Sequence, residues 1–108
     1  MNYILLVLAG ALLCNAIPHL ASGLRGEPFP TPFATPRGVG HSSPVMNFVW
    51  GTGNLLIGLE VLSANLDAGD PRFGRLAVIA GFVGLGIHLA HHFGRVRAGA
   101  LPTDRREP

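Results

Sequence analysis

The chain has 108 residues, of which 48% are hydrophobic and 13% are charged. This length suits one domain, and the composition is too apolar for a typical soluble protein. All eight basic residues are arginines, and they flank apolar runs, which favours contact with anionic lipid headgroups and gives no reason to expect a nucleic-acid partner.

Three apolar runs predict transmembrane helices at about residues 3–22, 45–65 and 74–94. Each run is close to the roughly 20 residues that cross ~30 Å of hydrocarbon, and none offers water the charged face of a soluble helix. We therefore expect an all-α membrane protein whose three helices form a glycine-packed bundle. Residues 1–95 would be the single domain and 96–108 a disordered cytoplasmic tail.

The first run lacks the basic start of a secretory signal and stays apolar for longer than such a signal does. Its single cysteine, Cys14, is expected to be a buried and inert thiol. Asn15 needs a hydrogen-bond partner in lipid, so we expect a buried polar residue that joins two helices, in preference to a catalytic group. Pro18, next to His19, is expected to kink or loosen the last turn.

The segment from Gly23 to Pro44 holds five of the nine prolines and predicts a loop. Its stretch 29–33, Phe-Pro-Thr-Pro-Phe, suits polyproline II or successive turns and excludes a helix or an inner strand. Two phenylalanines between prolines indicate a connector that lies against the bilayer or the helix ends, with a peptide-docking motif as the weaker alternative. Ser43 is the predicted N-cap of the next helix, with Pro44 at its first position.

The second run carries a stripe of small and amide residues: Asn47, Gly51, Asn54, Gly58 and Asn65. We expect this stripe to pack against a similar stripe on the third helix. Asn47, as a buried polar residue, and Asn54 would bond across that seam. Gly51, Asn54 and Gly58 would be the helix-packing residues of this stripe.

Glu60 is predicted to be a further buried polar residue, more than a quarter-turn away from that stripe. An ionisable residue within a span is a functional candidate. Pairing with Arg72 or Arg75, or snorkelling to the surface, is the favoured interpretation. The residues between them, 67–72, predict a compact turn that makes the second and third helices antiparallel and adjacent.

The third run combines small residues and histidines on one face: Gly74, Ala77, Gly81, Gly84, His88, His91 and His92. We expect Gly81 and Gly84 to pack against another helix. The i,i+3 and i,i+4 spacings of the histidines can present two imidazoles to one metal ion.

With three crossings, all five histidines would lie at the same side of the membrane. His19, His88, His91 and His92 are therefore a candidate metal site for a transition metal or haem. Histidines that lie at headgroup level and bind nothing explain the pattern equally well.

Two resemblances accompany these patterns. The stretch 88–92, His-Leu-Ala-His-His, resembles the H-x-x-H-H box of membrane fatty-acid desaturases and hydroxylases, which are di-iron enzymes with several such boxes, whereas this chain has one. The pattern Asn15-x-x-Pro18-His19, followed by G-x-x-G from Gly23 and by the stretch 29–33, resembles a family of small uncharacterised bacterial integral-membrane proteins. That resemblance implies a three- or four-span inner-membrane protein and brings no known activity.

Six arginines lie in the first loop and the tail, against two in the turn at 67–72 and the start of the third run. The positive-inside rule therefore predicts the N-terminus outside and the C-terminus in the cytoplasm. Taken together, the patterns favour a homo-oligomer or an accessory subunit of a larger membrane complex, whose partners are lipid and membrane proteins. The alternatives are a histidine-rich metal- or haem-binding protein, and a small channel or proton-linked transporter that uses Glu60 and the asparagines.

Overall fold

The protein, described here from a computed structural model, is defined for residues 2–66 and 71–99. It consists of α1 (Tyr3–Leu24), α2 (Pro44–Asn65) and α3 (Pro71–Arg97), and these ranges contain no strand. Each helix is long and apolar enough to cross a membrane. The predicted all-α fold with three candidate spans is therefore confirmed. The turn predicted at 67–72 falls mostly outside the described residues, as does most of the predicted tail.

The helix ends follow from local chemistry. The Ser43 side chain accepts a hydrogen bond from the backbone N–H of Met46 at 3.1 Å, and Pro44 follows as the first helical residue. This N-cap is the one predicted, and proline suits the position because its missing N–H would have no partner there. Pro18 lies inside α1, and the helix nevertheless continues to Leu24.

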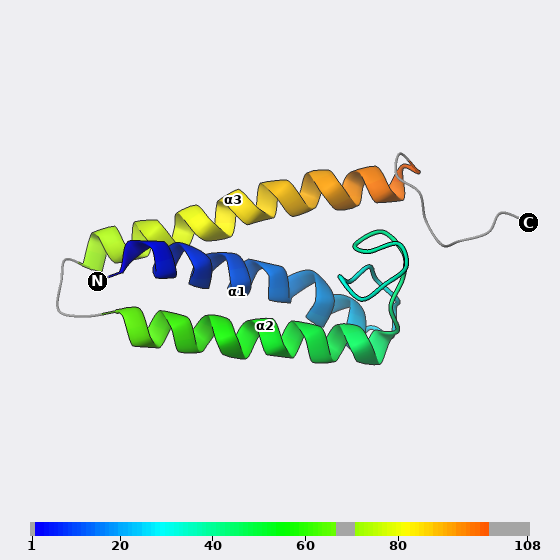
Figure 1. Ribbon diagram of the computed structural model, residues 1–108, viewed down its shortest axis with the longest axis horizontal. Helices are drawn as coiled ribbons and strands as arrows, with labels where there is room; N and C mark the ends of the chain where they lie inside the picture. Colours follow the sequence, from blue (N-terminus) through cyan, green and yellow to red (C-terminus); the bar gives the residue numbers. More distant parts are fainter. Residues whose placement is uncertain (1, 67–70, 100–108) are drawn as a thin grey trace, which may run out of the picture.

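α1 is the central helix of the bundle. It packs against α2 on one side and α3 on the other, whereas α2 and α3 do not contact each other within the described residues (Figure 1). The expected packing of the second helix against the third is therefore wrong. A short connection places two helix ends near each other but does not make the helices touch along their length. The small residues of α1 let α2 and α3 each approach α1 more closely than α2 and α3 approach each other.

Glycines set the distances between α1 and its neighbours. A Cβ at Gly10 would overlap the Val78 carbonyl oxygen, and a Cβ at Gly81 would overlap the carbonyl oxygen of Val7, so the backbones of α1 and α3 meet there. On the other side, a Cβ at Gly51 would lie 2.8 Å from the backbone nitrogen of Leu20. The helices can therefore approach this closely only where a side chain is missing.

The proline-rich loop, residues 25–43, folds back between the ends of α1 and α3, which diverge towards it (Figure 1). Phe29 and Ser42 pair through two backbone hydrogen bonds, of 3.2 and 3.0 Å. Phe29 also packs on Phe93 of α3, with ring centroids 4.6 Å apart. The loop is thus a built part of the bundle and closes the end at which the helices separate.

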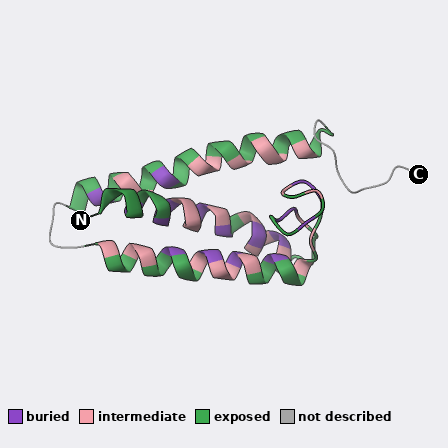
Figure 2. Ribbon diagram, in the orientation of Figure 1, coloured by how far each residue is buried: buried purple, intermediate pink, exposed green. Residues whose placement is uncertain are grey.

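Much of the outer surface of the helices is exposed in the isolated chain (Figure 2). Large apolar side chains, among them Ile4, Leu56 and Ile87, are exposed on all three helices. The fully buried side chains include polar ones, Asn47 and Thr31. This inversion is expected of helices whose outer faces contact lipid and whose polar groups must be satisfied inside the protein.

Candidate functional site

Two asparagine contacts connect α1 to α2. Asn15 donates from Nδ2 to Oδ1 of Asn54 at 3.0 Å, and Asn54 in turn donates to the Trp50 carbonyl oxygen in its own helix at 2.8 Å. Asn15 thereby has the interhelical partner that an amide within an apolar helix requires. That partner lies on α2, so the amide stripe of α2 faces α1 and not α3.

Asn47 determines which ring nitrogen of neutral His19 carries the proton. It is fully buried, and its Nδ2 lies within 2.9–3.2 Å of the carbonyl oxygens of Phe29, Ser42 and Ser43. Because carbonyls only accept, this nitrogen is the donor and the amide orientation is set. Its Oδ1, 2.7 Å from Nδ1 of His19, must then accept a proton from the imidazole.

It follows that neutral His19 is the Nδ1–H tautomer and that its Nε2 carries a lone pair. Nε2 has no hydrogen-bond partner within the described residues. His19 is also buried, 2% exposed, and its ring stands edge-on to those of Phe29 and Trp50. The fold therefore holds one imidazole in one orientation with one free acceptor.

His92 connects α3 to the proline-rich loop. Its Nε2 lies 2.6 Å from the Gly38 carbonyl oxygen, so Nε2 is the protonated nitrogen of this imidazole. Gly38 has φ +67°, in the left-handed region that glycine adopts most easily. This hydrogen bond spans the gap between loop and helix and forms one wall of a pocket.

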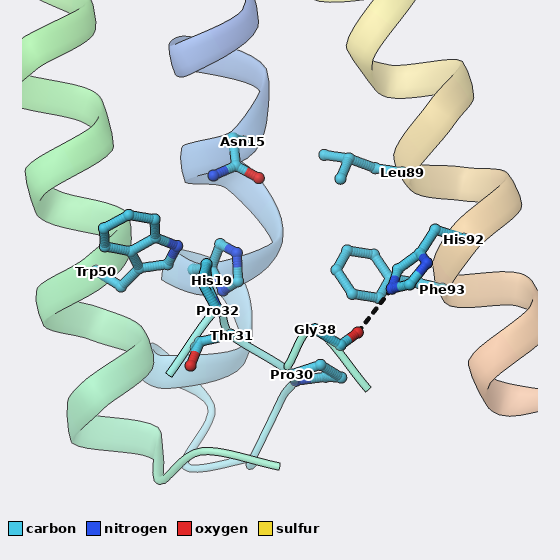
Figure 3. A pocket seen from close by; sticks show the side chains of 10 residues that line it. All are labelled: Asn15, His19, Pro30, Thr31, Pro32, Gly38, Trp50, Leu89, His92 and Phe93. Atoms are coloured by element: carbon cyan, nitrogen blue, oxygen red, sulfur yellow. Dashed lines mark hydrogen bonds between the residues drawn. The ribbon is translucent and has the colours of Figure 1, made fainter. Parts of the chain in front are cut away.

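That pocket lies between the three helices and the loop (Figure 3). Its volume is about 180 Å³. Rings and apolar groups form most of its wall, and polar groups reach it from α1, α2 and α3. It is lined by Asn15, His19, Pro30, Thr31, Pro32, Gly38, Trp50, Leu89, His92 and Phe93. This volume is below the roughly 300–1,000 Å³ of sites for drug-sized ligands, so the pocket suits a small molecule or one group of a larger one.

Trp50 is a residue of this pocket that sequence reasoning missed. Its Nε1 is buried and has no hydrogen-bond acceptor within the described residues. Figure 3 shows the nitrogen edge of the indole on the side of His19. The available signal was the position of a tryptophan inside a span, since tryptophans in membrane proteins concentrate at the interfaces.

The four histidines predicted as a metal site do not gather. Within residues 2–66 and 71–99, no three His, Cys, Asp or Glu side chains are placed to hold a metal ion. His88 and His91 are exposed, and the His88 ring stacks on that of His92 with centroids 6.3 Å apart. His92 instead faces the loop, and His19 uses one nitrogen on Asn47. Helical spacing correctly predicts that His88 and His92 are neighbours on α3, but it does not predict which part of the protein these histidines face.

The remaining predicted residues divide between buried and exposed positions. Gly51 and Gly58 of α2 and Gly81 of α3 all pack against α1, whereas a Cβ at Gly84 would meet nothing within 4 Å. Glu60, predicted to be buried, is exposed, because it lies away from the buried face of α2, which holds Asn47, Gly51, Asn54 and Gly58. Asn65 donates to the Val61 carbonyl oxygen of its own helix.

Fold and site together define a helical protein with three candidate membrane spans and a small, partly polar pocket at the loop end. Comparisons with protein-family models, with curated proteins and with solved structures found no match.

Proposed function

We propose that this chain is a structural subunit of a membrane assembly, and that α3 contacts a further transmembrane helix from a second copy or from another membrane protein. The observation that supports this most strongly is an exposed strip on α3 formed by Gly84, His88 and His91. We refer to these three residues as the α3 strip.

The α3 strip is unfavourable in contact with lipid. His88 lies six residues before Gly94, where the predicted span ends, which is about 9 Å at a rise of 1.5 Å per residue and places its imidazole inside that span. Polar side chains at such depth usually face protein or water. One turn before His88, the open space at Gly84 would let another helix approach closely.

The proposal also fits the uneven covering of the helices. α3 is the least buried of the three, and α1, between its two neighbours, is the most buried. A partner helix on the α3 strip would give α3 a second neighbour and would cover polar groups that the isolated chain leaves exposed.

Cross-linking in native membranes tests this proposal. In a Cys14→Ala background, Ala80→Cys places a thiol one turn before Gly84, and Ile79→Cys places one on a different face of the same turn; both positions are exposed. We expect oxidation to cross-link the Ala80→Cys variant, and not the Ile79→Cys variant, to a second copy or to a different protein. Gly84→Leu should abolish that product. Equal cross-linking of the two variants, or none in either, would contradict the proposal.

We propose further that the protein resides in a bacterial inner membrane with the N-terminus outside and the loop end in the cytoplasm. The positive-inside rule supports this orientation, because the exposed Arg25 and Arg37 lie in the loop and Arg95 and Arg97 at the adjoining end of α3. In intact cells, a membrane-impermeant maleimide should fail to label His41→Cys, an exposed loop position, and should label it after lysis. Labelling before lysis would reverse the orientation.

A further inference from the structure

Trp50 and His19 leave two complementary hydrogen-bonding groups at the pocket. The indole N–H is a buried donor without an acceptor, and Nε2 of His19 is an acceptor without a donor, within the described residues. The two rings stand edge to face, with centroids 6.5 Å apart, and both line the same pocket (Figure 3). One polar group that reaches both atoms would satisfy the donor and the acceptor together.

We propose that this pocket binds the head of a long-chain alcohol or an undissociated fatty acid. The oxygen of its O–H or C=O group accepts from Nε1 of Trp50, and its O–H donates to Nε2 of His19. This inference concerns a ligand site and does not depend on the proposed subunit role.

The pairing of one donor with one acceptor selects the chemistry of the head. A hydroxyl both donates and accepts, and a carboxylic acid does so with its two oxygens. An ester or a ketone would accept from Trp50 but leave His19 without a donor. A phosphate or another full anion would bring only acceptors to the lone pair of neutral His19.

A metal ion fits less well than a protic oxygen. It would use the lone pair of His19 but leave the indole N–H buried without a partner, which is unfavourable in an apolar site. The described residues also place no second and third ligand beside His19.

The fixed tautomer of His19 maintains the selectivity for a head group that carries an O–H. Asn47 cannot turn its amide to offer His19 a donor without placing its Oδ1 against the carbonyl oxygens of Phe29, Ser42 and Ser43. Nε2 therefore stays an acceptor as long as the imidazole is neutral.

The size and wall of the pocket indicate that only the head is enclosed. A volume of 180 Å³ is below the roughly 300–1,000 Å³ of pockets that enclose most of a drug-sized ligand. The pocket wall includes Leu89 and Phe93 of α3 and Trp50 of α2, and both helices are apolar enough to lie in the hydrocarbon core of a membrane. An alkyl chain that leaves the pocket between them would enter lipid, which points to a membrane amphiphile and not to a water-soluble alcohol.

The single tryptophan of the chain makes the site directly measurable. The full chain in phosphatidylcholine nanodiscs is titrated with decanol, decanoic acid, methyl decanoate and decane while Trp50 emission is recorded. We expect a saturable change with decanol and decanoic acid, and at least tenfold weaker binding of methyl decanoate and decane. Ethanol and acetic acid form a second arm; saturation with these alone would overturn the membrane source of the ligand.

Two variants separate binding from partition into the bilayer. Trp50→Phe combined with Phe73→Trp moves the reporter to an exposed position on α3, and its emission should show no saturable change. Trp50→Phe alone keeps an aromatic ring but removes the donor, and should weaken binding of labelled decanol, measured by dialysis, by tenfold or more. Leu89→Phe leaves both polar groups and fills the pocket, so it should weaken binding as well.

Circular dichroism reports whether each variant keeps its helices. Equal saturation by all four ten-carbon compounds would contradict the proposal, as would the absence of saturation by any of them, because the pocket would then hold only water. Unchanged affinity in a helical Trp50→Phe protein would also overturn it.

Discussion

The two sides of α1 are held by different chemistry. Towards α2, side chains bond across the interface, through Asn15 with Asn54 and His19 with Asn47. Towards α3, the closest approach is made by backbone at Gly10 and Gly81. Since lipid tails are as apolar as the helix surfaces, apolar burial cannot drive either association. The α1–α2 interface combines polar bonding with close packing at Gly51, whereas close packing at Gly10 and Gly81 holds α3 against α1.

This difference indicates which interface of the bundle is more sensitive to substitution. An interface built on backbone contact tolerates no added atom, because the opposing backbone cannot turn aside as a side chain can. An interface built on hydrogen bonds loses only those bonds, and polar groups in membranes often find other partners. We therefore expect steric changes on the α3 side to cost more than polar deletions on the α2 side.

The largest effect is expected from Gly81→Leu. The new side chain would overlap the carbonyl of Val7 and separate α3 from α1, with a loss of about 3 kcal/mol or more. Unfolding in mixed detergent and dodecyl sulfate micelles, followed by far-UV circular dichroism, measures this loss. Gly53→Leu is the matched control, because a Cβ at Gly53 meets nothing within 4 Å. Equal losses at both positions would show that the crossing is not close.

Asn47→Leu should have the next largest effect. It removes the acceptor of the His19 proton and the donor to three carbonyls, and we expect a loss of about 2 kcal/mol because buried polar groups stay unmet. The same unfolding assay applies. Asn65→Leu, whose amide bonds only within its own helix, should cost much less. A neutral Asn47→Leu change would mean that water can replace this network.

His92→Phe should loosen the proline-rich loop. The hydrogen bond to Gly38 is worth about 1 kcal/mol, so loop opening should become about fivefold more frequent. Trypsin reports this opening as faster cleavage after Arg37, which is exposed in the loop. His91→Phe changes an exposed histidine and should leave the cleavage rate unchanged. The same acceleration in both variants would exclude a specific role for His92.

The smallest effect is expected between Asn15 and Asn54. A double-mutant cycle with alanine at both positions should give a coupling of about 0.6 kcal/mol, the typical value for a hydrogen bond between membrane helices. The cycle is needed because Asn54 also bonds the Trp50 carbonyl, a contact that a single mutant would lose as well. A coupling near zero would mean that this hydrogen bond adds nothing to α1–α2 affinity beyond helix packing and the contact of His19 with Asn47.

The features that could be predicted from the sequence are those that depend on the residues of a single helix. The three spans follow from run length, and the N-cap at Ser43 from local chemistry. The stripe of α2 that includes Gly51 and Asn54 is indeed its buried face. These features depend on periodicity or on neighbours within a few residues, which a single sequence displays.

Sequence reasoning failed where a partner had to be chosen. The buried stripes of α2 and α3 look equally suited to each other and to α1, so the sequence offered no reason to place α1 between them. The histidines of α3 look equivalent by spacing, yet His92 bonds the loop and His91 is exposed. The loop gives His92 a partner that His91 lacks. Gly38 is 54 residues away from His92 in the chain, and local sequence patterns carry no information about such a distant contact.

The order of residues alone specifies three helices long and apolar enough to cross a membrane, and the small or polar faces of α2 and α3, because hydrocarbon thickness and helical period act along the chain. The tertiary structure decided which helix is central, which nitrogen of His19 carries the proton, and that Trp50 presents an unmet donor beside it. These outcomes depend on where separate segments meet, since a hydrogen-bond partner and a backbone contact exist only once two surfaces are in place.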